Sequence, residues 1–199
     1  RDAWLDLVPQ DGSGPSGLSQ PGALWVPSAS GVGSEAMSER FDAIGAQFEI
    51  LTAQEAQALS PGLDPMGEAC LFTPEDWCLD VTVVTERLYH EATLLGVRFF
   101  TAAVTDFSLG TATLSDGRQI QADHLVIASG LGRGMVSIAP ELALLSPIKG
   151  QILHFTGGPT FGPVVRTPRA YVAPQPSGGV VGATMEAGVN DRGVDLNDI

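Results

Sequence analysis

The feature that most constrains this chain is the stretch from Asp123 to Gly132, which predicts one buried strand followed at once by a turn of small residues. Residues 125–128 form a continuous apolar run that is too short for an independent helix, which is typical of a strand covered on both faces. The glycines that follow let the backbone approach a ligand closely, and open α/β sheets bind ligands just beyond the carboxyl ends of their strands. A buried strand with an ordinary tight turn fits the same residues, so both interpretations stay open.

The charge balance and the cysteines exclude several classes of protein. The formal net charge is −13, from 23 acidic and 10 basic residues, and such a surface repels the phosphates of nucleic acids. No apolar run approaches the roughly 20 residues that span a bilayer, and the first residues show no signal peptide. The spacing of Cys70 and Cys78 fits neither a redox pair nor a zinc site. We therefore expect unpaired thiols, no metal site, no nucleic-acid partner, no membrane span and a cytoplasmic location.

The apolar patterns and turn residues predict a mixture of strands and helices. Helices are predicted at 34–47, from Thr52 to just before Pro61, and at 81–95. Strands are predicted at 23–27, 48–51, 97–100, 102–109, 111–114, 124–128, 150–155, 169–174 and 179–184. Residues 62–77 are predicted to be irregular because of their prolines. Helix, strand, β-meander and buried strand thus follow one another between residues 81 and 128.

Short motifs predict where several of these elements begin and turn. Thr52 and Glu55 form a capping box, in which the Thr52 hydroxyl accepts from the Glu55 amide and the Glu55 carboxylate accepts from the Thr52 amide. Asp80 is expected to cap the helix that follows it. Asp116–Gly117 predicts the tight turn of a hairpin, because the glycine adopts positive φ without strain.

Five motifs, in their order along the chain, are similar to those of one enzyme family. They are Thr52-Ala53-Gln54-Glu55-Ala56 with Ser60-Pro61-Gly62-Leu63, the section from the helix at 81–95 to Gly130, Pro147-Ile148-Lys149-Gly150-Gln151, Tyr171-Val172-Ala173-Pro174, and Val181-Gly182-Ala183-Thr184-Met185-Glu186. On these residues the chain resembles the FAD-dependent D-amino-acid oxidase superfamily, and within it the glycine oxidases and D-amino-acid dehydrogenases. The resemblance covers nearly the whole chain.

The resemblance implies an α+β fold, in which a mixed or antiparallel sheet with helices forms a substrate domain beside part of an FAD-binding α/β domain. It implies that residues 1–64 are the first part of the substrate domain and that 146–199 are a truncated second part of it. Residues 65–145, with the helix at 81–95, the meander and the strand at 124–128, are implied to be part of the FAD-binding domain. The family's GxGxxG phosphate-binding motif and its C-terminal segment do not occur, and the chain does not begin with methionine. We therefore expect it to be a central fragment.

The reaction implied by the resemblance is oxidation of the C–N bond of a small amino acid or amine by hydride transfer to FAD. The flavin does the difficult chemistry, so the protein has to orient the substrate and exclude water, and catalytic residues stay unassigned. The alternatives are a related flavoenzyme that oxidises a 2-hydroxy acid or glycerol phosphate, and a non-catalytic binding or assembly module. The expected partner is a small-molecule amine or amino acid, and assembly into a homo-oligomer stays open. The isolated chain is expected to be incomplete and inactive.

The resemblance also indicates substrate-binding residues. Tyr171 aligns with a tyrosine that lines the substrate site in glycine-oxidase-like members, and a phenol can hydrogen-bond a carboxylate while its ring supplies an apolar wall. Arg166 and Arg169 are nearby cations that attract a carboxylate, and Met185 ends the next strand facing the same cavity. Sheet packing for the tyrosine, solvent exposure for the arginines and core packing for the methionine are the alternatives.

On the cofactor side, the resemblance indicates Val104 and the turn formed by Ser129, Gly130, Leu131 and Gly132. Val104 matches a position whose backbone N–H and C=O meet the adenine of FAD, which a strand edge of any sequence can provide. The turn matches one that lies over the cofactor. The chain's 3 histidines are expected to be structural or solvated, not catalytic.

Overall fold

The computed structural model describes residues 17–27, 33–63, 69–158, 161–175 and 177–195. Contacts divide the chain into two compact units: unit 1 comprises residues 1–95, 150–184 and 194–199, and unit 2 comprises residues 96–149 and 185–193. The fold is α+β, as predicted, with a seven-stranded mixed sheet in unit 1. The helix predicted at 81–95 groups with unit 1, and the proposed domain boundaries stay a prediction.

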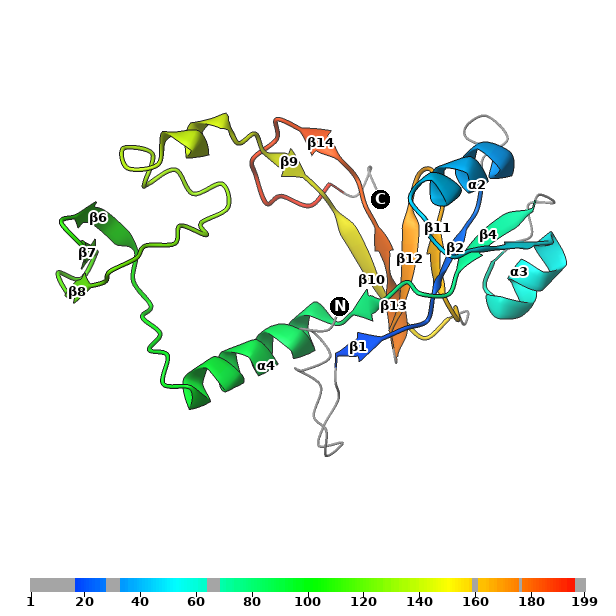
Figure 1. The fold of residues 1–199 in the computed structure, drawn as a ribbon, viewed down its shortest axis with the longest axis horizontal. Coiled ribbons are helices and arrows are strands. Elements are labelled where there is room, and N and C mark those ends of the chain that lie inside the picture. The colour runs from blue at the N-terminus through cyan, green and yellow to red at the C-terminus, as the bar shows by residue number, and fades with distance from the viewer. Residues whose placement is uncertain (1–16, 28–32, 64–68, 159–160, 176, 196–199) are drawn as a thin grey trace. The chain divides into compact units, whose positions relative to one another are not determined.

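Unit 1 is built on the seven-stranded sheet, whose order from edge to edge is β10-β13-β12-β11-β2-β4-β3 (Figure 1). Its strands are β10 (Ile152–Thr156), β13 (Gly178–Gly182), β12 (Tyr171–Gln175), β11 (Val164–Arg166), β2 (Ala23–Trp25), β4 (Cys70–Thr73) and β3 (Glu49–Leu51). Neighbouring strands are antiparallel except β11 and β2, which run parallel. A separate short pair joins β1 (Leu18–Ser19) to β5 (Cys78–Leu79). The sheet therefore unites two segments that lie far apart in the sequence.

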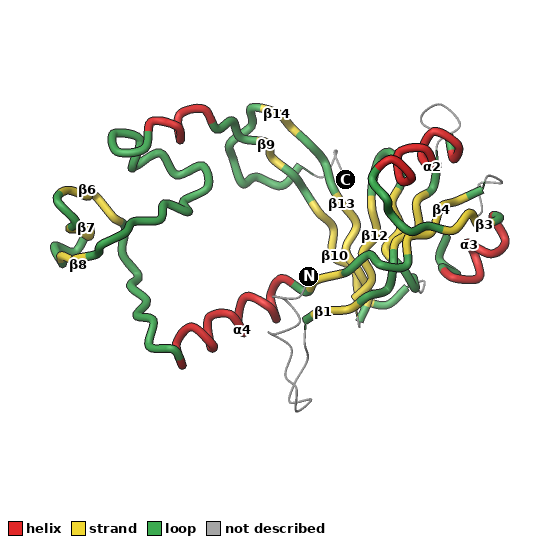
Figure 2. Tube along the Cα trace, viewed as in Figure 1, coloured by secondary structure: helices red, strands yellow, loops and turns green. Residues whose placement is uncertain are grey.

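Among the described residues of unit 1, the helices are α2 (Ser34–Ala43), α3 (Ala53–Leu59) and α4 (Val81–Leu94), drawn red in Figure 2. The capping box predicted for α3 is confirmed: the Glu55 amide donates to Thr52 Oγ1 over 3.3 Å, and the Thr52 amide donates to Glu55 Oε2 over 2.8 Å. The cap predicted for α4 is confirmed too, because Asp80 Oδ1 accepts from the amides of Thr82 and Val83. Side chains thus satisfy amides that have no partner inside the helix.

Replacing Thr52 with alanine is expected to lower the free energy of unfolding by about 1 kcal/mol, because the first turn of α3 loses its side-chain acceptor. The Thr52 amide and then its hydroxyl hold the pKa of Glu55 below its usual value. The stabilisation by ionised Glu55 is therefore complete above the unfolded-state pKa and is lost as the pH falls through the lower folded-state pKa. Urea denaturation at neutral and acid pH measures both effects. Thr52→Ser keeps the hydroxyl. If this variant lost as much free energy of unfolding as Thr52→Ala, the helix cap would not be the cause of the loss.

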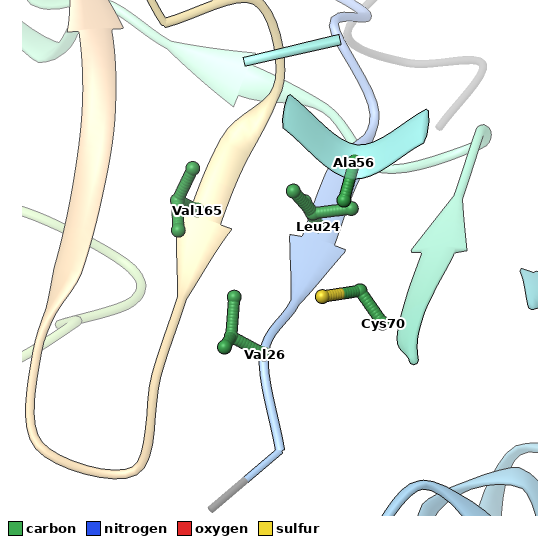
Figure 3. Close-up of a cluster of buried hydrophobic side chains, with 5 residues drawn as sticks. All are labelled: Leu24, Val26, Ala56, Cys70 and Val165. Carbon is green, nitrogen blue, oxygen red and sulfur yellow. The ribbon is translucent and has the colours of Figure 1, made fainter. Parts of the chain in front are cut away.

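One buried apolar cluster of unit 1 lies on a single face of the sheet. Leu24, Val26, Cys70 and Val165 form a buried cluster, and Ala56 of α3 packs over them (Figure 3). Leu24 and Ala56 have no exposed surface. Because Leu24 and Val165 are direct neighbours across β2 and β11, their side chains point to the same side. We call this side, covered by α3, the core face.

Unit 2 contains a three-stranded meander in the order β6-β7-β8. Its strands are β6 (Val104–Ser108), β7 (Thr111–Leu114) and β8 (Gln119–Gln121). The predicted hairpin turn between β7 and β8 is confirmed: Gly117 has a φ of +85°, and the Leu114 amide donates to the Arg118 carbonyl over 2.8 Å. The unit also contains a short 3₁₀ helix, η1 (Pro140–Leu144), and the strand pair of β9 (Ile148–Lys149) with β14 (Glu186–Ala187).

The buried strand predicted at 124–128 is wrong, and so is the strand predicted at 97–100. Neither run is a strand in the structure, and Val126 is 86% exposed. A strand is stable when a neighbouring strand satisfies its backbone N–H and C=O groups. Among the described residues, no strand pairs with either run. Both runs have the composition of buried strands and lack the neighbours that would bury them.

Residues 62–77, predicted to be irregular, contain a central strand of the sheet. β4 pairs with both β2 and β3, and its Leu71 has no exposed surface. The apolar run that forms β4 is only a few residues long and is flanked by prolines, which obscures it in the sequence. Its burial depends on β2 and β3, which come from earlier in the chain.

Candidate functional site

The face of the sheet opposite the core face carries the predicted substrate residues. Register places Trp25, Arg166, Tyr171, Gly182 and Ile152 directly opposite one another across β2, β11, β12, β13 and β10. Directly paired positions point to the same side of a sheet, so these residues form one row, which we call the Tyr171 row. Sequence reasoning identified only two of its members, because register across strands is not visible in any one strand.

α2 covers one end of this face. Its Phe41 packs against Trp25, with the ring centroids 5.3 Å apart and the rings nearly perpendicular. Toward the other end, Arg166 is exposed, Tyr171 is half-buried and Ile152 is 48% exposed. The accessible part of the Tyr171 row therefore runs from Arg166 to the edge strand β10.

Arg166 and Tyr171 are neighbours, but their side chains lean in opposite directions. The Arg166 guanidinium carbon lies 5.0 Å from the centre of the Trp25 ring. The Tyr171 ring lies over Gly182, where its phenol oxygen is 2.8 Å from the position that a Cβ would occupy. Trp25 and Gly182 belong to strands separated by two others, and adjacent strands lie about 4.8 Å apart. The Arg166 guanidinium and the Tyr171 phenol therefore lie at two separate places on this face of the sheet.

Arg169 and Met185 do not belong to the Tyr171 row. Arg169 lies in the turn between β11 and β12, where Thr167 Oγ1 accepts from the amides of Arg169 and Ala170, and its side chain is exposed. Met185 is part of unit 2 and is 77% exposed. The structure thus brings together Arg166 and Tyr171, and substrate contacts of Arg169 and Met185 stay a prediction.

A nearly buried lysine anchors the segment that begins at Met185. The side chain of Lys149 is 11% exposed, and its Nζ lies 3.0 Å from Asp191 Oδ1 and 3.9 Å from Glu186 Oε2. The hydrogen bond from Lys149 holds the pKa of Asp191 below its usual value. These ion pairs link β9 to the residues that immediately follow Met185.

Val104 lies on a strand that, among the described residues, has a neighbouring strand on one side only. β6 is the outer strand of the meander. The Ala103 amide donates to Ser115 Oγ over 3.2 Å, and the Ala103 carbonyl accepts from the Ser115 amide over 2.8 Å. Backbone groups alternate in direction along an antiparallel strand, so those of Val104 point away from β7. This geometry fits recognition of an adenine by main-chain atoms, which stays a prediction.

The predicted cofactor turn is a closed, exposed turn. The Gly132 amide donates to the Ser129 carbonyl over 2.9 Å, and Ser129 Oγ donates to the Gly132 carbonyl over 3.0 Å. Gly130 has a φ of +55°, and Leu131 is 42% exposed. The turn fits one side of a cofactor cleft, but it lacks the glycine pattern that binds a pyrophosphate at a helix N-terminus. Its contact with FAD stays a prediction.

The meander borders a hollow that sequence reasoning missed. The hollow has a volume of about 660 Å³ and lies along β8. Arg98 and Arg118 approach the ring of Phe100, with guanidinium carbons 5.8 Å and 4.9 Å from its centre. Arg118 also donates to Asp116, and this hydrogen bond holds the pKa of Asp116 below its usual value. Because one of its two arginines is already neutralised, we assign the hollow no function.

The part of the chain that the structure describes contains no candidate metal site and no disulfide bond. Within those ranges, no group of three or more His, Cys, Asp or Glu side chains is placed to hold a metal ion. Cys70 and Cys78 form no disulfide. Across the same residues, every helix is too short or too polar to cross a bilayer.

Comparison with known proteins places the chain in a family. The family model described as DAO, FAD dependent oxidoreductase, matches residues 1–199. A comparison with curated protein sequences finds no match.

Solved structures resemble the chain over nearly all of its length. Glycine oxidase from Geobacillus kaustophilus has a TM-score of 0.78 and 21% identity, and the match covers 99% of this chain and 56% of that chain. Iminodiacetate oxidase from Chelativorans sp. BNC1 has a TM-score of 0.74 and 27% identity, with 99% and 57% covered. L-proline dehydrogenase from P. horikoshii has a TM-score of 0.75 and 18% identity, also with 99% and 57% covered. The chain thus spans a little over half the length of these proteins.

Proposed function

The chain belongs to the FAD dependent oxidoreductase family, and on this basis we propose that the protein containing it oxidises the C–N bond of a small amino acid or amine. The observation that carries the proposal is the family match over residues 1–199. Because the chain spans only 56–57% of the similar solved structures, the activity is proposed for the whole protein and not for this chain alone.

The names of the similar proteins support this substrate class. Each name denotes an oxidase or a dehydrogenase, and glycine, iminodiacetate and proline each contain an amine nitrogen and a carboxylate. The iminodiacetate oxidase is 27% identical to this chain, and the other two are similar in fold. We therefore propose a substrate that carries both groups.

The described residues have distinct tasks in this proposal. The chemistry that bound FAD would supply is an acceptor for the hydride that leaves the carbon beside the nitrogen. The Tyr171 phenol donates a hydrogen bond to the substrate carboxylate, and its ring forms an apolar wall. Arg166, stacked on Trp25, adds positive charge on the same face and attracts the carboxylate. The outward backbone groups of Val104 and the turn at 129–132 would contact FAD.

The proposal is tested by adding small amino acids and amines, without oxygen, to the purified protein that contains this chain. We expect an amino-acid substrate to bleach the visible absorbance of oxidised flavin and to form an imine, which water then hydrolyses to a carbonyl compound. A protein that binds no flavin would contradict the proposal and favour a binding module. Bleaching by 2-hydroxy acids or glycerol phosphate, but not by amines, would contradict the assigned bond and favour oxidation of a C–OH group.

Tyr171→Phe tests the assigned substrate contact. The change removes one hydrogen bond to a charged group, so we expect KM to rise about tenfold. Tyr89→Phe is the matched control, because Tyr89 lies on α4 and is 56% exposed. Steady-state kinetics of both variants decide the point, and an unchanged KM in Tyr171→Phe would remove Tyr171 from the substrate site.

A further inference from the structure

The Tyr171 ring rests on Gly182, where any Cβ would force the neighbouring side chains to shift. Gly182 directly faces Tyr171 across β12 and β13, and it directly faces Ile152 across β13 and β10. A Cβ at Gly182 would lie 2.8 Å from Tyr171 Oη, 2.9 Å from Tyr171 Cζ and 2.8 Å from Ile152 Cγ2. The phenol and the Ile152 side chain therefore share the space that any other side chain at this position would fill.

This packing determines how high the phenol stands above the sheet. The ring lies across β13, so its oxygen is displaced from its own strand by about one strand spacing, 4.8 Å. Ile152 borders the ring on the side of β10, and the backbone of Gly182 lies beneath it. A methyl group on residue 182 would lift the phenol away from the sheet, into the space above the Tyr171 row.

We propose that Gly182 is a positioning residue that holds the Tyr171 phenol low on the sheet, at the height where it meets the substrate carboxylate. The inference rests on the proposed function, in which Tyr171 binds that carboxylate. Hydrogen bonds weaken steeply when distance and angle depart from their optimum, so a lifted phenol loses its partner. Gly182 has no side chain that could contact the substrate. It affects substrate binding only by setting the position of the Tyr171 phenol.

β13 provides a matched control on the opposite face. Phe155 of β10 lies over Gly179, where a Cβ would be 2.7 Å from Phe155 Cζ and 2.9 Å from Phe155 Cε1. Side chains alternate along a strand, so position 179 faces the core side, where Phe155 meets Phe161 with ring centroids 6.4 Å apart. Gly179→Ala therefore places a methyl group against an aromatic ring, and also 2.9 Å from the Ala173 carbonyl oxygen, on the face away from Tyr171.

The test compares Gly182→Ala, Gly179→Ala and Tyr171→Phe in the flavin-loaded protein that contains this chain. We expect Gly182→Ala to raise the substrate KM about tenfold, the effect of losing one hydrogen bond to a charged group. Gly179→Ala, whose methyl group also meets a backbone oxygen, should lower the melting temperature at least as much as Gly182→Ala does and leave KM unchanged. Gly182→Ala added to Tyr171→Phe should raise KM no further, because the hydrogen bond is already absent.

Fluorine NMR of protein labelled with fluorotyrosine gives a readout that does not depend on turnover. The Tyr171 resonance is assigned by its loss in Tyr171→Phe, and we expect Gly182→Ala, but not Gly179→Ala, to shift it. An unshifted resonance overturns the inference, and so does an unchanged KM in Gly182→Ala when Tyr171→Phe raises KM. If Tyr171→Phe itself leaves KM unchanged, the substrate role of Tyr171 in the proposed function fails, and the inference fails with it.

Discussion

Replacing Leu24 with alanine is expected to lower the free energy of unfolding of unit 1 by about 3 kcal/mol. Leu24 has no exposed surface and lies on β2, between β11 and β4. Its neighbours in the buried cluster include Val165, Cys70 and Ala56 (Figure 3). The loss combines the burial of the deleted methyl groups with the cavity that remains, because strands paired on both sides cannot move inward to fill it. Urea denaturation followed by circular dichroism measures the change.

Leu94→Ala is the control for this prediction, because it makes the same chemical change at an exposed position. Leu94 is the last residue of α4 and is 69% exposed. We expect the free energy of unfolding to change by less than about 0.5 kcal/mol, since alanine is also a good helix former. Equal losses in the two variants would show that Leu24 is not a core residue.

Replacing Gly178 with alanine is expected to separate β10 from β13. We expect the free energy of unfolding to fall by about 3 kcal/mol or more. Gly178 pairs with Thr156, and a Cβ on it would overlap the Phe155 carbonyl oxygen and lie 2.9 Å from Thr156 Cα. These are backbone atoms, which cannot rotate away as a side chain does, so the strands themselves must move. Hydrogen exchange of the β10 amides measures the separation, and we expect their protection to be lost.

Gly134→Ala tests whether any glycine substitution has this effect. A Cβ at Gly134 would meet no heavy atom within 4 Å. We expect the free energy of unfolding of this variant to stay the same or to rise slightly, because alanine allows the unfolded chain fewer backbone conformations than glycine does. Protected β10 amides in Gly178→Ala would contradict the predicted separation of β10 from β13. Loss of β10 would also remove Ile152 from beside Tyr171, so KM is expected to change with it.

The two faces of the sheet in unit 1 place different demands on the sequence. The core face is a cluster of apolar side chains around Leu24 and Ala56, and it requires mainly volume and apolar character. The Tyr171 row, by contrast, sets a guanidinium, a phenol and a bare backbone beside one another on successive strands. Each of its members has a separate chemical or steric role, so substitutions there are expected to change binding more than stability.

Local signals in the sequence predicted the boundaries of several elements. The capping box at Thr52, the cap at Asp80 and the turn at Gly117 all form as expected. Each depends on residues within a few positions of one another, whose hydrogen bonds and dihedral angles do not need the rest of the fold. Prediction failed where a run needs a distant partner: β4 was missed although it is buried, and 124–128 was assigned a strand that does not form.

The sequence by itself determined the family resemblance, the α+β class and the helix caps. It also indicated Tyr171 and Arg166 as substrate candidates. All of these inferences depend on residue types and on spacings of a few residues. Only the tertiary structure decided that Tyr171 and Arg166 lean apart, and that Trp25, Gly182 and Ile152 share their row. The physical reason is register: a side chain's neighbours on a sheet come from other strands, and sliding one strand by one residue would send its side chains to the opposite face.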